Sequence, residues 1–206
     1  MKTNILCMAF ACITALPGAL TAQVVTEPVE NKEFLLQYYQ ATLDNLREQT
    51  MGLSEAQLQF KPDAGTWSVS QCLEHIVLTE EALSGMVGAV MTQPENPEDK
   101  NLRASTDEEL IAGITDRSFK AKAPETLQPD GKYTQASSAL EDLVEVRQKL
   151  LTLINDTSVE AMRNRIADAP FGKLDGYQYL LFVAGHTARH TAQIEELKAM
   201  ATFPEN

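Results

Sequence analysis

The chain has 206 residues, of which 44% are hydrophobic, and its 29 acidic and 17 basic residues give a formal net charge of −12. Phosphate backbones and anionic lipid surfaces repel so acidic a chain, which argues against nucleic acid as a partner. No internal repeat or low-complexity tract is present, so the sequence predicts one globular domain.

The first 22 residues have the layout of a secretory signal peptide. Lys2 gives a basic start, a nearly uncharged apolar run follows, and small residues lie around Ala19 and Ala22. We expect cleavage after Ala22 and a periplasmic or secreted protein. An uncleaved anchor fits less well, because a Pro-Gly pair interrupts a run that is already short for a membrane span. We therefore expect no stable membrane insertion after cleavage.

The predicted mature domain, residues 23–206, has 184 residues. Its net charge is −13, because Lys2 is the only charged residue of the leader. This length suffices for one domain with a sizeable core. Cys72 is the one cysteine that remains after cleavage, so no internal disulfide can form and packing alone must hold the fold.

The pattern of apolar residues is helical through almost the whole domain. Asn31 is placed to cap a first helix, and residues 54–60 add a short extra turn after it. A second helix is predicted to begin at Ser68, which forms a capping box with Gln71, and to extend to about Met91.

The segment 92–135 contains four of the nine prolines and predicts a long connection. One short helix is expected within it at 107–117, behind Thr106. The third long helix is predicted to open with a second capping box, formed by Ser138 and Glu141.

A loop is expected at 157–174, and Asp175 with Gln178 is predicted to cap a fourth helix that ends near Met200. No run of alternating apolar and polar residues is long enough to indicate a sheet. Four main helices, with a long crossover between the second and the third, predict an all-α fold, a four-helix bundle.

Two of the three histidines, His186 and His190, lie four residues apart in the fourth helix. Positions i and i+4 share one face of a helix, so both imidazoles can reach one ion, at about 2.0–2.1 Å for zinc. Gln193 falls on the same stripe one turn later and is a candidate to hydrogen-bond a ligand or a bound water. The spacing alone is a weak signal, because a partly exposed polar stripe gives the same pattern.

The third histidine, His75, lies on the apolar side of the second helix. Such a histidine is more often a satisfied core residue than a ligand, but here every histidine falls on a core-facing stripe of one of two helices. Three imidazoles with an open fourth position are typical of catalytic zinc sites. His75, His186 and His190 therefore form a candidate three-ligand metal site, and such a ligand set suits zinc, nickel, iron or copper.

Two segments resemble the DinB-like superfamily. The first is FKPDAGTWSVSQCLEHI, where in that superfamily Trp-Ser leads into a helix with a metal-binding histidine. The second is FGKLDGYQYLLFVAGHTARHTAQIEEL, which resembles its last helix, where HxxxH followed by Gln-Ile supplies two more ligands. The resemblance spans residues 33–200 and implies up-down-down-up topology, with a divalent metal, often zinc or nickel, on the three histidines. The superfamily includes thiol-dependent S-transferases, a maleylpyruvate isomerase-like branch and members without an established activity.

Five other side chains lie near the histidines in sequence. Cys72 is expected to be a small core residue, with a fourth metal ligand or a nucleophile as the alternative. Trp67 is expected to pack on the end of the bundle, or else to line the mouth of a pocket. Arg189 is expected to form a surface ion pair, or else to bind an anion near the metal. Glu74 and Glu81 turn away from the histidine of their own helix, so no general base is identified.

These observations favour two functions. The first is an exported metal-dependent hydrolase or thiol transferase, in which the three histidines hold an ion that lowers the pKa of a bound water or substrate thiol. The alternative is a non-catalytic periplasmic bundle that binds a metal or a small ligand, or that retains vestigial histidines. The expected partner is an unidentified small molecule, and a homodimer is compatible with the fold because such bundles often pair.

Overall fold

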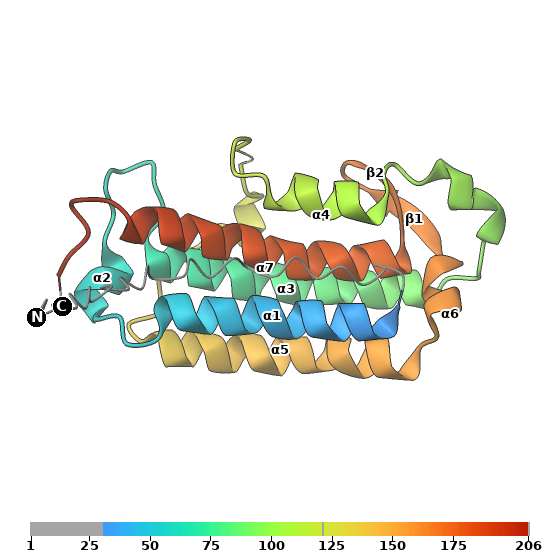
Figure 1. Ribbon diagram of the computed structural model, residues 1–206, viewed down its shortest axis with the longest axis horizontal. Helices are drawn as coiled ribbons and strands as arrows, with labels where there is room; N and C mark the ends of the chain where they lie inside the picture. Colours follow the sequence, from blue (N-terminus) through green and yellow to red (C-terminus); the bar gives the residue numbers. More distant parts are fainter. Residues whose placement is uncertain (1–30, 121, 206) are drawn as a thin grey trace, which may run out of the picture.

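The computed structural model describes residues 31–120 and 122–205, and the predicted signal peptide lies outside this part of the chain. The described residues form four long helices: α1 (Lys32–Thr50), α3 (Val69–Met91), α5 (Ala136–Asp156) and α7 (Gly176–Lys198). Figure 1 shows that α1 and α7 run in one direction and that α3 and α5 run in the other. The four-helix bundle is confirmed, with up-down-down-up topology and a long crossover from α3 to α5.

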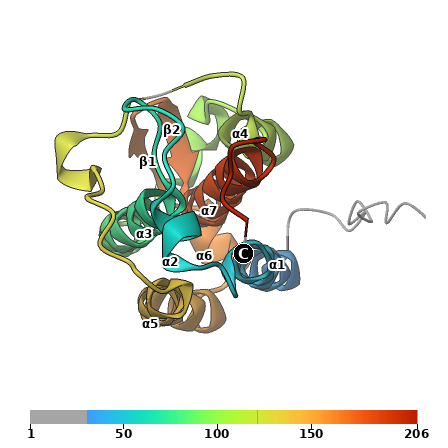
Figure 2. The same cartoon turned by 90° about the vertical axis from the view of Figure 1, so that its left-hand side faces the viewer.

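Shorter elements surround the bundle. They are α2 (Glu55–Gln59), the 3-10 helices η1 (Pro97–Leu102) and η2 (Glu125–Leu127), α4 (Asp107–Thr115), α6 (Val159–Arg163), β1 (Ile166–Ala169) and β2 (Gly172–Asp175). The last long helix, α7, packs against α1 and α3, and α4 lies along its outer side (Figure 2). Among the described helices, none has both the length and the hydrophobicity to cross a membrane.

Local capping signals explain where most helices begin. Asn31 caps α1 by accepting the N–H of Phe34 at 2.6 Å. Capping boxes begin four further helices, formed by Ser54 with Gln57, Ser68 with Gln71, Thr106 with Glu109 and Asp175 with Gln178. In each box two backbone N–H groups of the first turn are satisfied by side chains. The predicted starts of the first, second and fourth long helices are confirmed.

The predicted start of the third long helix is wrong. Helix α5 begins at Ala136, and its N-cap makes no side-chain hydrogen bond, so Ser138 lies inside the first turn. Ala136 and Ala139 are buried in the core. Just before them, Tyr133 is held at both backbone groups by the Ser70 hydroxyl of α3, at 3.0 and 2.7 Å. Packing against α3 therefore sets the start of α5 in place of the local capping signal.

The predicted loop at 157–174 contains helix α6 and a β-hairpin, so the described residues add one two-stranded sheet to the mostly helical fold. Strands β1 and β2 pair antiparallel, and Ala169 pairs with Gly172 next to the turn. Gly172 has a φ of +122°, where glycine is favoured, and a Cβ there would lie 2.5 Å from the Cβ of Ala104. Each strand has only four residues, which is too few for an alternating pattern to stand out in the sequence.

A buried ion pair joins all four long helices. Arg147 on α5 donates to both carboxylate oxygens of Glu80 on α3, each at 2.7 Å. Arg147 also donates to the Tyr39 carbonyl and the Thr42 hydroxyl of α1 and to the Thr187 hydroxyl of α7, at 2.7, 3.1 and 3.0 Å. These five residues are termed the central clasp, and Tyr39 among them also belongs to one of the two apolar core clusters. Because every partner is hydrogen-bonded, the burial of the two charges is compensated.

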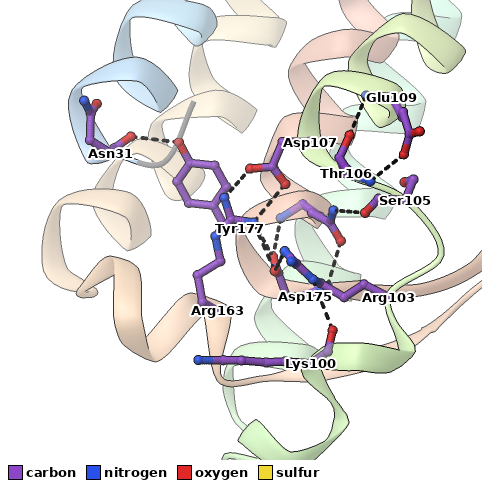
Figure 3. A network of polar contacts seen from close by, with 11 residues as sticks. Asn31, Lys100, Arg103, Ser105, Thr106, Asp107, Glu109, Arg163, Asp175 and Tyr177 are labelled. Atoms are coloured by element: carbon purple, nitrogen blue, oxygen red, sulfur yellow. Dashed lines mark hydrogen bonds and ion pairs between the residues drawn. The ribbon is translucent and has the colours of Figure 1, made fainter. Parts of the chain in front are cut away.

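A second polar network holds the start of α7 (Figure 3). Arg163 of α6 pairs with Asp107 of α4 and, at 3.0 Å, with Asp175, the N-cap of α7. Its guanidinium lies over the ring of Tyr177, 3.9 Å from the centroid. Arg103 donates to Asp175 from the other side, at 3.0 Å. The network fixes α4 and α6 against the helix that carries two of the three histidines.

Candidate metal centre

The three histidines meet between α3 and α7. His75 comes from α3, and His186 and His190 come from α7. One ring nitrogen of each lies within 4.8 Å of the others, and the ring centroids are 5.0, 4.6 and 4.5 Å apart. An ion bound at about 2.0–2.1 Å from each nitrogen draws its ligands closer than this, so the three imidazoles must approach one another to hold one. Within the described residues, the group consists of histidines alone.

Hydrogen bonds fix the orientation of two of these rings. The Nδ1 of His75 lies 2.8 Å from the carbonyl oxygen of Leu127, and the Nδ1 of His190 lies 2.9 Å from the Oε1 of Gln193. Because an amide oxygen only accepts, each Nδ1 carries the proton and donates it. The Nε2 of each ring therefore keeps its lone pair for a metal ion, which is how metal-binding histidines are usually oriented.

Burial keeps all three imidazoles neutral. It lowers the pKa of His75, although the hydrogen bond to the Leu127 carbonyl partly opposes the effect. Burial and then the neighbouring His75 lower the pKa of His190 to about 3. The pKa of His186 is well below its ordinary value, first through burial and then through the other two histidines. Neutral imidazole is the form that binds metal ions, so the cluster is ready for a cation at neutral pH.

A glycine lets the surrounding helices approach the site closely. A Cβ on Gly185 would lie 2.5 Å from the Cγ2 of Ile114 in α4 and 3.3 Å from the hydroxyl oxygen of Tyr38 in α1. The first distance is far below van der Waals contact. The absence of a side chain one residue before His186 therefore allows α4 to pack closely against α7 beside the histidine cluster.

Trp67 covers one side of the cluster. Its ring centroid lies 4.7 Å from that of His75 and 5.9 Å from that of His190. The ring also packs against the apolar cluster at this end of the bundle. Trp67 therefore packs on the bundle end, as expected, and its ring also borders His75 and His190.

The comparison with known proteins places this arrangement in a family. The family model of the DinB superfamily matches residues 38–194. This chain belongs to the DinB superfamily. It is 27% identical to the uncharacterized protein YuaE of Bacillus subtilis (strain 168) over 147 residues. This alignment covers 71% of this chain and 86% of YuaE.

The same fold occurs in a solved structure. YfiT from Bacillus subtilis superposes with a TM-score of 0.58 at 18% sequence identity, over 84% of this chain and 89% of YfiT. YfiT is described as a probable metal-dependent hydrolase with an unusual four-helix bundle topology. At this identity the likeness shows a shared fold alone.

Two candidates near the histidines have structural roles. Cys72 is fully buried in the core, and burial raises the pKa of its thiol to about 12. It therefore stays protonated and belongs to the core, as expected. Glu74 accepts the backbone N–H groups of Gly131 and Lys132, at 2.6 and 3.1 Å. Its carboxylate holds the end of the crossover and, as predicted, turns away from His75.

Arg189 makes a different contact from the expected one. Its guanidinium donates to the backbone carbonyls of Ile114, at 3.3 Å, and of Asp116 and Phe119. Among the described residues, no ion pair to Arg189 occurs. The predicted surface ion pair is therefore wrong. The backbone carbonyls at the end of α4 and just after it lie close enough to accept the N–H groups of the Arg189 guanidinium.

Two features of the site could not be found from the sequence. The carbonyl that orients His75 belongs to Leu127, which is 52 residues away in the crossover, and a backbone group leaves no signal in the residue type. The central clasp reaches α7 at Thr187, directly after His186. Glu80 and Arg147 are charged residues in a chain with many of them, and only the packing of the four helices brings them together.

Proposed function

We propose that this DinB superfamily protein is a metal-dependent hydrolase whose divalent ion is held by His75, His186 and His190. The observation that carries the proposal is a cluster of three neutral imidazoles, two of them buried and one partly exposed, in which His75 and His190 each donate from Nδ1 and therefore have the lone pair on Nε2. The description of YfiT, a protein with the same fold, as a probable metal-dependent hydrolase supports it.

The ligand set fits a divalent ion of borderline softness, and we propose zinc or nickel. Three protein ligands leave one coordination position for a water or a substrate, the pattern of catalytic zinc sites. A divalent ion bound there acts as a Lewis acid toward a carbonyl and lowers the pKa of water. The chain itself orients the imidazoles through the Leu127 carbonyl and Gln193. Trp67 keeps solvent from one side of His75 and His190.

We also propose that the protein works outside the cytoplasm. The basic start, the apolar run and the small residues near Ala22 support cleavage of residues 1–22. N-terminal sequencing of the protein recovered from its native host or a bacterial host tests this directly. A mature chain that starts at Gln23 is expected, and a chain from the soluble cytoplasmic fraction that retains the first 22 residues would contradict it.

The hydrolase proposal is tested with untagged protein of residues 23–206. Metal-free protein, prepared with a chelator, is reloaded with zinc or nickel and assayed on a panel of esters and amides, with thiol-conjugation substrates as a parallel set. Hydrolysis should appear on reloading and should be lost in His190→Ala. The matched control is Val144→Ser, which alters an exposed apolar residue of α5 and should leave the rate unchanged. Thiol conjugation without hydrolysis would replace the proposed reaction. Metal binding without any turnover would identify a binding protein.

A further inference from the structure

A row of aromatic side chains leads away from the histidine cluster along α7. Phe182 lies one turn before His186 on the same face of the helix, and the two ring centroids are 6.5 Å apart. Phe171, at the turn of the β-hairpin, continues the row. Its ring lies 4.8 Å from that of Phe182, at an angle of 33°. Phe171 and Phe182, termed the aromatic strip, thus extend from the candidate metal centre to the hairpin.

The strip lies on the open side of the centre. His75 and His190 are only 4% and 7% exposed, whereas His186 is partly exposed. Phe182, beside His186, is also partly exposed. A molecule that reaches the cluster therefore meets His186 first.

Trp67 makes the direction of approach more specific. It stacks close to His75 and His190, the two histidines with the least exposure. The aromatic strip, in contrast, adjoins His186 at the other end of the cluster. A ligand that places one atom at the metal position therefore extends along the strip, because Trp67 occupies the other end of the cluster.

Phe171 is a large apolar residue that remains exposed although it packs on a second ring. It occupies a two-residue hairpin turn, where small or polar residues are usual, and it is 47% exposed. Its ring packs on Phe182 and leaves much of its surface in water. Exposed apolar side chains that lie together often mark a binding surface, and Phe171 and Phe182 lie together beside His186.

We propose that the aromatic strip binds a planar aryl group of the substrate, attached directly to the carbonyl that reacts at the histidine cluster. The substrate class is therefore the aryl ester or aryl amide, and Phe182 with Phe171 determine this specificity. The inference rests on the proposed function for the position of the carbonyl, while the aryl-binding surface itself needs no metal.

The first arm of the test uses metal-free protein, residues 23–206, and fluorine NMR. We expect the resonance of 4-fluorobenzamide to broaden on addition of the wild-type protein, whereas that of fluoroacetamide stays sharp. Phe182→Leu, which keeps an apolar side chain and removes the ring, should abolish the broadening, and Phe171→Ser should reduce it. The control Val144→Ser, at an exposed apolar position of α5, should behave as the wild type.

The second arm uses cobalt-loaded protein and its visible absorption. Benzohydroxamate and acetohydroxamate carry the same metal-binding head and differ in the aryl group. Aromatic contacts favour the former by about 10-fold in Kd, and this ratio should fall to about 2-fold in Phe182→Leu, with acetohydroxamate affinity and cobalt content unchanged.

The outcomes separate the two proposals. Failure of the wild type to bind cobalt would overturn the metal centre, while the metal-free arm still decides the strip. Equal broadening of the two amides by the wild type, or an aryl preference that survives in both phenylalanine variants, would overturn the strip whether or not cobalt binds.

Discussion

Replacement of Arg147 by methionine tests the central clasp. The variant keeps an apolar stem of similar length and removes the positive charge. It leaves the carboxylate of Glu80 buried, since both side chains are only 1–2% exposed, and it leaves the Tyr39 carbonyl without its 2.7 Å donor. Removal of one partner of a buried pair typically costs about 3–5 kcal/mol. We therefore expect Arg147→Met to lower the free energy of unfolding by about 4 kcal/mol.

The assay is urea unfolding of residues 23–206, followed by far-UV circular dichroism. The midpoint should fall while the m-value stays the same, because the surface exposed on unfolding is unchanged. The double variant Glu80→Met/Arg147→Met removes both charges and should be more stable than Arg147→Met alone, since apolar replacement of a whole buried pair is often tolerated.

A matched control comes from an exposed pair on α1. Arg47 and Asp44 are 2.9 Å apart with side chains 46% and 55% exposed, so Arg47→Met should change stability by less than about 1 kcal/mol. A loss for Arg147→Met no larger than that of Arg47→Met would refute the role given to the clasp. The same conclusion would follow if the double variant were less stable than Arg147→Met.

Three further predictions concern the histidine cluster and its surroundings. The pKa of His190 is about 3 in the folded chain and about 6.5 when unfolded, so unfolded chains bind protons first as the pH falls. The free energy of unfolding of the metal-free protein should therefore fall as the pH is lowered from about 6.5 to about 3. In His190→Gln the slope of this fall should be smaller than in the wild type by about 1.4 kcal/mol per pH unit. Urea midpoints that are equal for both proteins at every pH would contradict this. Gly185→Ala should destabilise by about 1–3 kcal/mol, and Ile114→Ala in the same chain should restore part of the loss; an unchanged melting temperature for the single variant would exclude the tight contact. Gln193→Leu should weaken zinc binding by about 10- to 100-fold in a competition titration, and wild-type affinity would show that the amide does not orient His190.

The sequence predicted the long helices because their signals are local. Asn31, Ser68 and Asp175 cap the helices that follow them, and the apolar period identifies the buried face of each. Where a signal is absent or misleading, prediction failed. Ser138 with Glu141 has the form of a capping box, yet burial of Ala136 draws the start of the helix forward.

The site was predictable to the extent that rare residues carry it. The chain has only three histidines, so their shared placement on two core-facing stripes was a usable signal. The orientation of His75 depends on the Leu127 carbonyl, and Phe182, which lies beside His186, packs on Phe171 of the hairpin. These features follow from the crossover and the hairpin, whose positions are set by tertiary packing. A phenylalanine in a predicted loop gave no reason to connect it with a metal site.

We propose that three histidines from two helices hold one divalent ion, and the metal content of single-histidine variants tests this site. Untagged residues 23–206 are exposed to zinc, nickel and manganese in turn, dialysed and measured by elemental analysis, beside His75→Ala, His186→Ala and His190→Ala. We expect about one ion per wild-type chain, as for a site with three protein ligands. Each of the three variants should lose most of its metal and retain its helical circular dichroism. A wild-type protein that binds none of the three metals, or one whose metal content is the same in all three variants, would contradict it.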